Sequence, residues 1–183
     1  PKAAEAASAA LEIAQLAMLT KDEATAKAAL DGADFAAADL PTTIRAMMAA
    51  HTFKLTEQRD TLLQTAKAKA AAQPVDARFE LVTAIAMGLK DQPAADALVA
   101  EIEASAKTDD DKAAVALGKA MLTRRSSVKP KPETVALLEA VAKTWPATPA
   151  GRKAAAKLMA ANLGPGSEPV PFQRSEEHTS ELQ

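Results

Sequence analysis

Few side chains in this sequence could carry out chemistry, and they are widely spaced. The chain contains no cysteine, which excludes disulfides, thiolate metal sites and cysteine nucleophiles among the residues present. Its two histidines, His51 and His178, lie far apart in the sequence. A metal site needs several ligands. We therefore interpret His51 as a structural side chain on a helix rich in methionine and alanine.

The densest acidic group is formed by Glu101 and Glu103 together with Asp109, Asp110 and Asp111. Such a group could bind a cation or supply half of a carboxylate pair. No glycine occupies the turn position that a calcium-binding loop requires. The three aspartates follow Thr108 at the expected start of a helix, where the helix dipole favours carboxylates. We therefore interpret the group as helix capping and solvation.

Basic side chains gather in one loop between two expected helices. Its polar residues are Arg124, Arg125, Ser126, Ser127, Lys129 and Lys131. This loop could hold a phosphate or an acidic peptide terminus. It lacks interleaved aromatic residues, and the chain has no basic excess, so we predict no nucleic-acid binding. The interpretation we favour is a solvated connection between helices.

No motif for phosphate binding, hydrolysis or metal-dependent proteolysis is present. Phe79, Trp145 and the methionines recur at helical spacing, which indicates core packing rather than a cofactor site. Gly88 and Gly118 fall inside expected helices, where glycine is unfavourable, and we interpret them as close helix crossings. We therefore assign no catalytic, cofactor-binding or metal-binding residue, and we predict no enzyme activity for this segment.

The composition predicts an all-α fold. About a quarter of the residues are alanine, tyrosine is absent and glycine is sparse. Alanine is the best helix former, and β-branched residues are few. No apolar run approaches the roughly 20 residues that span a bilayer. The last ten residues hold one arginine and three glutamates, so residues 1–173 carry 21 basic and 21 acidic side chains. This balance gives no reason to expect an anionic partner.

Apolar periodicity and helix-stop residues predict about nine helices within residues 1–163. The clearest begins at Pro74, where Val75, Phe79 and Val82 form one inward stripe. In the first helix, over about 3–19, the large aliphatic side chains are expected to face inward: Leu11, Ile13, Leu16, Met18 and Leu19. The sequence Thr20–Glu23 is expected to form a capping box for the second helix.

Helices that begin near residues 75, 109 and 148 give a repeat of about 34 and then 39 residues. Two helices in a unit of about 34 residues are typical of tetratricopeptide repeats. Residues 145–154, Trp-Pro-Ala-Thr-Pro-Ala-Gly-Arg-Lys-Ala, resemble the repeat junction of tetratricopeptide-like proteins of bacterial envelopes. The usual Gly-Tyr pair is missing. We therefore expect antiparallel helix pairs stacked as a degenerate tetratricopeptide-like array, with an irregular helical bundle as the alternative.

Residues 164–173 are rich in proline and glycine and are expected to be a linker or the start of a truncated domain. Gly166, Pro169 or Pro171, and Phe172 resemble the segment before the first strand of redoxin-type thioredoxin-like domains, although their spacing differs. Many extracytoplasmic bacterial redoxins carry an alanine-rich helical region ahead of that domain. The resemblance implies a downstream domain with a Cys-x-x-Cys pair; the alternative is an ordinary proline-rich tail.

Residues 174–183, Arg-Ser-Glu-Glu-His-Thr-Ser-Glu-Leu-Gln, resemble a translated short-read sequencing adapter. We therefore expect the natural coding sequence to be interrupted near Gln173. Because the chain begins with Pro1, we also expect its N-terminus to be missing or processed. The expected organisation is a helical repeat-like domain over 1–163, a linker over 164–173 and an adapter-derived tail over 174–183.

Two functional hypotheses follow from these observations. In the first, the helices are a non-catalytic spacer or interaction region ahead of a thioredoxin-like thiol-disulfide redox domain, and the resemblance then points to the bacterial cell envelope or periplasm. In the second, they are a stand-alone scaffold that binds a protein or peptide on a grooved face. Both hypotheses require no cofactor in this segment.

Overall fold

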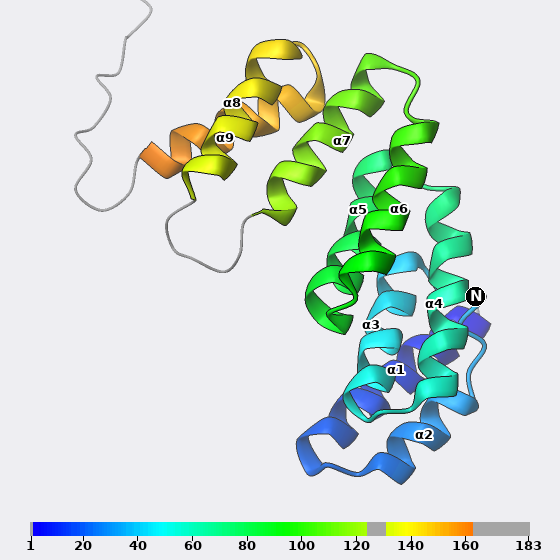
Figure 1. Ribbon diagram of the computed structural model, residues 1–183. Coiled ribbons are helices and arrows are strands. Elements are labelled where there is room, and N and C mark those ends of the chain that lie inside the picture. The colour runs from blue at the N-terminus through cyan, green and yellow to red at the C-terminus, as the bar shows by residue number, and fades with distance from the viewer. Residues whose placement is uncertain (1, 124–130, 163–183) are drawn as a thin grey trace, which may run out of the picture.

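The computed structural model describes residues 2–123 and 131–162, and these residues confirm the all-α prediction (Figure 1). Helices account for 82% of them, and no strand occurs among them. The helices are α1 (Lys2–Thr20), α2 (Glu23–Asp31), α3 (Leu40–Thr52), α4 (Thr56–Ala71), α5 (Val75–Thr83), the π-helical segment η1 (Ala84–Leu89) that continues α5, α6 (Gln92–Ser105), α7 (Asp109–Leu122), α8 (Pro132–Thr144) and α9 (Pro149–Asn162).

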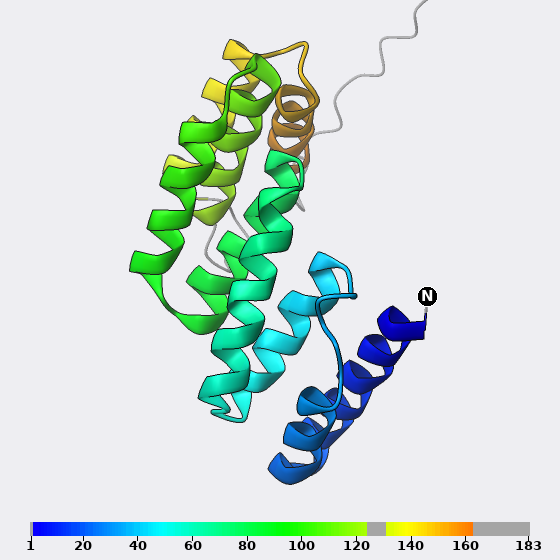
Figure 2. The same ribbon diagram turned by 90° about the vertical axis from the view of Figure 1, so that its right-hand side faces the viewer.

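Neighbouring helices pack in a regular order along the chain. α1 packs on α2, α3 on α4, α5 with η1 on α6, and α8 on α9. In addition, each odd-numbered helix packs on the next one: α1 on α3, α3 on η1, α5 on α7, and α7 on α9. Figures 1 and 2 show the result as an array with α1 and α2 at one end and α8 and α9 at the other.

The turns inside the first three helix pairs share one backbone feature. Lys21, Lys54 and Lys90 each adopt a left-handed conformation, with φ of 57°, 59° and 59°. They stand between α1 and α2, between α3 and α4, and between η1 and α6. A lysine rarely adopts this conformation, because its Cβ approaches the backbone carbonyl. The same costly turn therefore reverses the chain at three equivalent positions.

Aspartate and threonine side chains determine where several helices begin. Asp39 accepts a hydrogen bond from the Thr42 backbone N–H at 2.8 Å and so caps α3. The expected capping box at Thr20 is wrong, because α1 continues through Thr20, whose hydroxyl donates to the Ala17 carbonyl. Asp22 caps α2 instead, accepting from the Thr25 N–H at 3.0 Å.

The expected inward face of α1 is also largely wrong. Leu11 is buried, as are the alanines beside it: Ala7, Ala10, Ala14 and Ala17. The side chains of Ile13, Leu16, Met18 and Leu19 are instead exposed. Alanines let α1 approach α2 and α3 closely, so the small side chains occupy the contact and the large ones point away from it.

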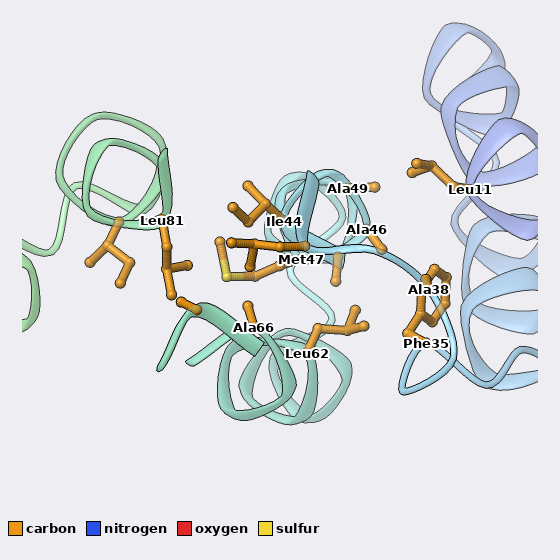
Figure 3. Close-up of a cluster of buried hydrophobic side chains, with 14 of the residues drawn as sticks. Leu11, Phe35, Ala38, Ile44, Ala46, Met47, Ala49, Leu62, Ala66 and Leu81 are labelled. Carbon is orange, nitrogen blue, oxygen red and sulfur yellow. The ribbon is translucent and has the colours of Figure 1, made fainter. Parts of the chain in front are cut away.

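Most of the core surrounds α3 (Figure 3). Ala46 and Ala49 lie on the side of α3 that faces Leu11 of α1, whereas Met47 points toward Leu81 of α5. Ala46, Met47 and Leu81 are fully buried. Because the helices meet through alanines on one side of α3 and larger side chains on the other, α3 ties the first helix pair to the third.

α7 joins two separate groups of buried side chains. Val115 belongs to the large core formed with the preceding helices. On another side of α7, Ala113, Leu117 and Ala120 pack with Leu138 and Val141 of α8 and with Ala150 and Ala154 of α9. The last helix pair is therefore attached to the array through one face of α7, formed by Leu117 and two alanines.

Two glycines make the close contacts between odd-numbered helices, which confirms their interpretation as crossing points. A Cβ atom at Gly118 of α7 would overlap the ring of Phe79 on α5, and one at Gly88 of η1 would overlap the end of Met48 on α3. Phe79 is a buried core side chain. Met48 is only half-buried and has a flexible end that can move aside.

We predict that Gly118→Ala destabilises the fold and that Gly88→Ala, the matched control, does not. Alanine gains up to about 1 kcal/mol of helix propensity at either position. At Gly118, overpacking against a rigid ring costs about 1–3 kcal/mol, which outweighs that gain. Urea unfolding followed by circular dichroism measures both free energies. Equal changes in the two variants would contradict a Gly118–Phe79 contact.

Candidate functional site

A hollow of about 450 Å³ lies over the middle of α7, between the C-terminal ends of α6 and α8. We call it the Trp145 groove. It is lined by Glu103, Ala106, Lys112, Val115, Ala116, Lys119 and Trp145. Figure 1 shows how α6 and α8 flank α7, and both helices pack against it. The groove is thus a space that two even-numbered helices leave open above the odd-numbered helix between them.

α7 forms the floor of the groove because of the spacing of its residues. Lys112, Ala116 and Lys119 follow one another at helical intervals and lie on one side of the helix. The start of α7 is fixed by a reciprocal capping box, in which the Thr108 hydroxyl accepts from the Asp111 N–H and the Asp111 carboxylate accepts from the Thr108 N–H, each at 3.1 Å. The lysines are therefore held on a well-anchored helix.

Trp145 forms one wall of the groove, and its backbone is fixed by several bonds. Its N–H donates to the Val141 carbonyl at 3.0 Å, which ends α8. Its carbonyl accepts from the Thr148 hydroxyl at 2.8 Å, and that hydroxyl in turn caps α9 by accepting from the Gly151 N–H at 3.0 Å. A Cβ at Gly151 would overlap the Trp145 carbonyl, so glycine is required there.

The interpretation of Trp145 and the methionines as core is correct only in part. The Trp145 residue is half-buried and borders the groove, whereas Phe79 and Met47 are buried in the large core. Met87 and Met159 are 48% and 66% exposed. Helical spacing alone does not separate these positions, because it says nothing about which side of a helix meets a neighbour.

The charges around the groove are paired near its rim. The Lys119 ammonium donates to the Glu103 carboxylate of α6, and the Lys112 ammonium lies 3.9 Å from the Asp109 carboxylate. Such exposed pairs contribute little to stability, so a ligand can replace either partner at small cost. An apolar floor of Val115 and Ala116 beside an indole and two ammonium groups suits an apolar side chain with an adjacent carboxylate.

Two further hollows offer weaker sites. One of about 470 Å³ lies between α2 and α4 and includes Asp31, Asp34 and Glu57, but Asp31 is already bonded by Lys27 and Gln58. The other, of about 230 Å³, lies where α5, α7 and α9 begin. There Lys153 of α9 lies 3.4 Å from the Asp76 carboxylate of α5. Neither hollow is lined by a half-exposed aromatic side chain of the kind that Trp145 provides in the groove.

The residues singled out in the sequence do not converge on one site. His51 is half-buried on α3. In the acidic group, Asp111 caps α7, and Glu103 and Asp109 pair with lysines. No group of three or more potential metal ligands occurs within residues 2–123 and 131–162. The basic loop, apart from Lys131, and the redoxin-like stretch lie outside the described residues.

Over the described part of the chain, no helix is both long enough and apolar enough to cross a membrane. Comparisons of the chain with protein-family models, with curated proteins and with solved structures find no match.

We predict that Asp111 contributes to the acid sensitivity of the fold. Hydrogen bonds from the Thr108 side chain and backbone lower the pKa of Asp111 below its usual value of 3.8. A lowered pKa means that the ionised form stabilises the native state above pH 3.8 and that this contribution is lost as the pH falls through the folded-state pKa. Asp111→Asn keeps an acceptor but cannot ionise, so it should flatten the loss of stability in acid.

Urea unfolding at neutral pH and below pH 3.8 measures this effect, with Asp96→Asn as the control. Asp96 is an exposed carboxylate that accepts from Gln92 within α6. The same acid dependence in the Asp111 variant as in the original chain would show that the cap does not act through its charge.

Proposed function

We propose that this chain is a non-catalytic helical scaffold that binds a protein or peptide partner in the Trp145 groove. The observation that carries the proposal is the position of the one tryptophan of the sequence, half-buried in the wall of a hollow of about 450 Å³. A volume of this size lies in the usual range of ligand pockets. Tryptophan is also among the side chains that contribute most energy to protein interfaces.

The arrangement of groups in the groove supports a peptide rather than a metal or nucleotide ligand. The floor is apolar at Val115 and Ala116, and charged side chains stand at the rim. Interfaces commonly have an apolar centre within a polar border. A partner that inserts an apolar side chain beside Trp145 would leave its flanking carboxylates within reach of Lys112 and Lys119.

The order of helix packing supports a repeat-type scaffold. α1, α3, α5 and α7 each contact an even-numbered neighbour and also the next odd-numbered helix, α3 through the η1 continuation of α5, as stacked helical hairpins must if they bury a continuous core. The left-handed lysines Lys21, Lys54 and Lys90 are 33 and 36 residues apart, close to the unit of about 34 residues of tetratricopeptide repeats. We therefore keep the tetratricopeptide-like array as part of the proposal.

We predict that peptides selected for binding from a random library will occupy the groove and change the fluorescence of Trp145. Because this is the single tryptophan, its emission reports directly on the groove. Trp145→Ala should weaken binding about tenfold or more, as expected for an aromatic anchor. Calorimetry or fluorescence polarisation with a labelled peptide measures the change.

Met87→Ala is the matched control, because Met87 is exposed on η1 and does not line the groove. Binding should survive this change. Lys119→Ala should weaken only peptides that carry a carboxylate. Selected peptides that bind Trp145→Ala and the original chain equally would refute the groove as the docking site.

A second candidate function is a spacer ahead of a thioredoxin-like redox domain. It is favoured by the Gly166, Pro169 or Pro171, and Phe172 stretch. In this case the helices would hold the redox domain or present a docking surface for it, and the thiol chemistry would belong to residues beyond this chain. The two candidates are compatible, because a spacer can also bind a partner.

If the spacer hypothesis is correct, a longer product that includes the redox domain should reduce insulin disulfides, and the present chain should be inactive because it has no cysteine. Sequencing the locus past the codon for Gln173 and assaying both proteins tests this prediction. A control in which the encoded Cys-x-x-Cys pair is changed to serines should lose the activity. A stop codon or a continuation without cysteines would remove the spacer hypothesis.

A further inference from the structure

α1 carries a second apolar face that no other helix of the described chain covers. Ile13 is 46% exposed and Leu16 is 63% exposed. Both lie on the same side of α1 as the exposed alanines Ala6 and Ala9. Leu19, 81% exposed, borders them. Three large exposed aliphatic side chains thus fall within seven residues of one helix.

The spacing of this face is that of a coiled-coil seam. Ala6, Ala9, Ile13 and Leu16 follow one another at intervals of three, four and three residues, which correspond to the a and d positions of two heptads. Isoleucine occupies an a position and leucine a d position. The buried face of α1, with Ala7, Ala14 and Ala17, points elsewhere and packs on α2 and α3.

The contacts of α1 with other described helices leave this face open. α3, α5 and α7 each pack on an odd-numbered helix on both sides, with α5 and η1 taken together, whereas α1 packs on its partner α2 and on one odd-numbered helix, α3. Figure 2 shows α1 at the end of the array. This open face has the spacing of a seam that joins helices.

We propose that two copies of this chain associate through α1, with the two α1 helices antiparallel about a twofold axis. The side chains of the seam are small in its N-terminal half (Ala6 and Ala9) and large in its C-terminal half (Ile13 and Leu16). An antiparallel arrangement places Ala6 opposite Leu16 and Ala9 opposite Ile13 of the second copy. Each large side chain then meets a small one, which keeps the helix separation even along the seam.

A parallel pair would fit less well, because it sets alanine against alanine at one end and leucine against leucine at the other. A head-to-tail contact with α9 is also disfavoured. The exposed Met159 of α9 lies on a helix whose other exposed or half-exposed side chains include Lys153 and Lys157, and two ammonium groups do not complement an aliphatic seam. A twofold contact uses the same patch on both copies.

The charged residues at the edge of the seam distinguish an antiparallel pair from a parallel one. Glu5, Glu12 and Leu19 line the outer edge of the seam, one heptad apart. In an antiparallel pair Glu12 meets Glu12 of the second copy near the twofold axis, which costs affinity through like-charge repulsion. In a parallel pair Glu12 would face alanines. Two heptads form a small interface, so the dimer should be weak and should dissociate on dilution.

Sedimentation velocity of the full chain over a broad range of concentration tests the dimer. We expect a reversible monomer–dimer equilibrium whose dissociation constant rises at least about tenfold, equivalent to about 1.4 kcal/mol, in Leu16→Lys. Met159→Lys is the matched control, an equally exposed apolar side chain on α9, and should leave the equilibrium unchanged. Circular dichroism verifies that both variants are folded.

Two measurements test the orientation. Glu12→Gln should strengthen the dimer by removing the repulsion at the axis. Because the chain has no cysteine, Ala9→Cys and Ile13→Cys can be introduced singly. A mixture of these two variants should oxidise mainly to the mixed disulfide, and disulfides between identical variants would overturn the antiparallel arrangement. A chain that stays monomeric at the highest concentrations, or a dimer unaffected by Leu16→Lys, would overturn the proposal.

Discussion

The structure depends on how closely its helices approach one another, and alanine and glycine set that distance. With few aromatic side chains in the sequence, there is little bulk to fill wide gaps. Several contacts between successive odd-numbered helices are therefore made through small residues, such as Ala46 and Ala49 on α3 and Gly118 on α7. When helices approach closely, their backbone and Cβ atoms are buried as well. This burial compensates for the small apolar area that each alanine side chain contributes.

This constraint also creates the groove. Because α7 meets α5 through Gly118 and meets α8 and α9 through Leu117 and two alanines, its remaining side is the one that carries Lys112, Ala116 and Lys119. α6 and α8 each pack on α7 rather than filling the space between them. Trp145, held by the turn into α9, closes that space only partly. The indole of Trp145 thus supplies a large, half-exposed apolar surface in the groove, where the small residues of α7 supply little.

Much of the fold could be predicted from the sequence. The stripe of Val75, Phe79 and Val82 is buried, and the interior glycine Gly118 marks a helix crossing. The left-handed turns could not be predicted, because lysine is not a residue that signals such a conformation. The prediction of which face of α1 is buried was wrong for a related reason. Periodicity locates apolar faces, but when a helix has two, one of alanines and one of larger residues, it does not say which meets the neighbouring helix.

The Trp145 groove and the α1 seam differ in shape. In the sequence, the groove and the seam both show apolar residues at helical spacing. That pattern alone predicts that each of them is buried in a core. In the structure, the groove is concave and has charged groups at its rim, which suits one inserted side chain from a peptide. The seam is a convex helix face with small side chains in its N-terminal half and large ones in its C-terminal half, which suits a second helix of the same kind in the opposite direction. Shape, which the sequence pattern does not encode, therefore distinguishes the two surfaces and the kinds of partner that fit them.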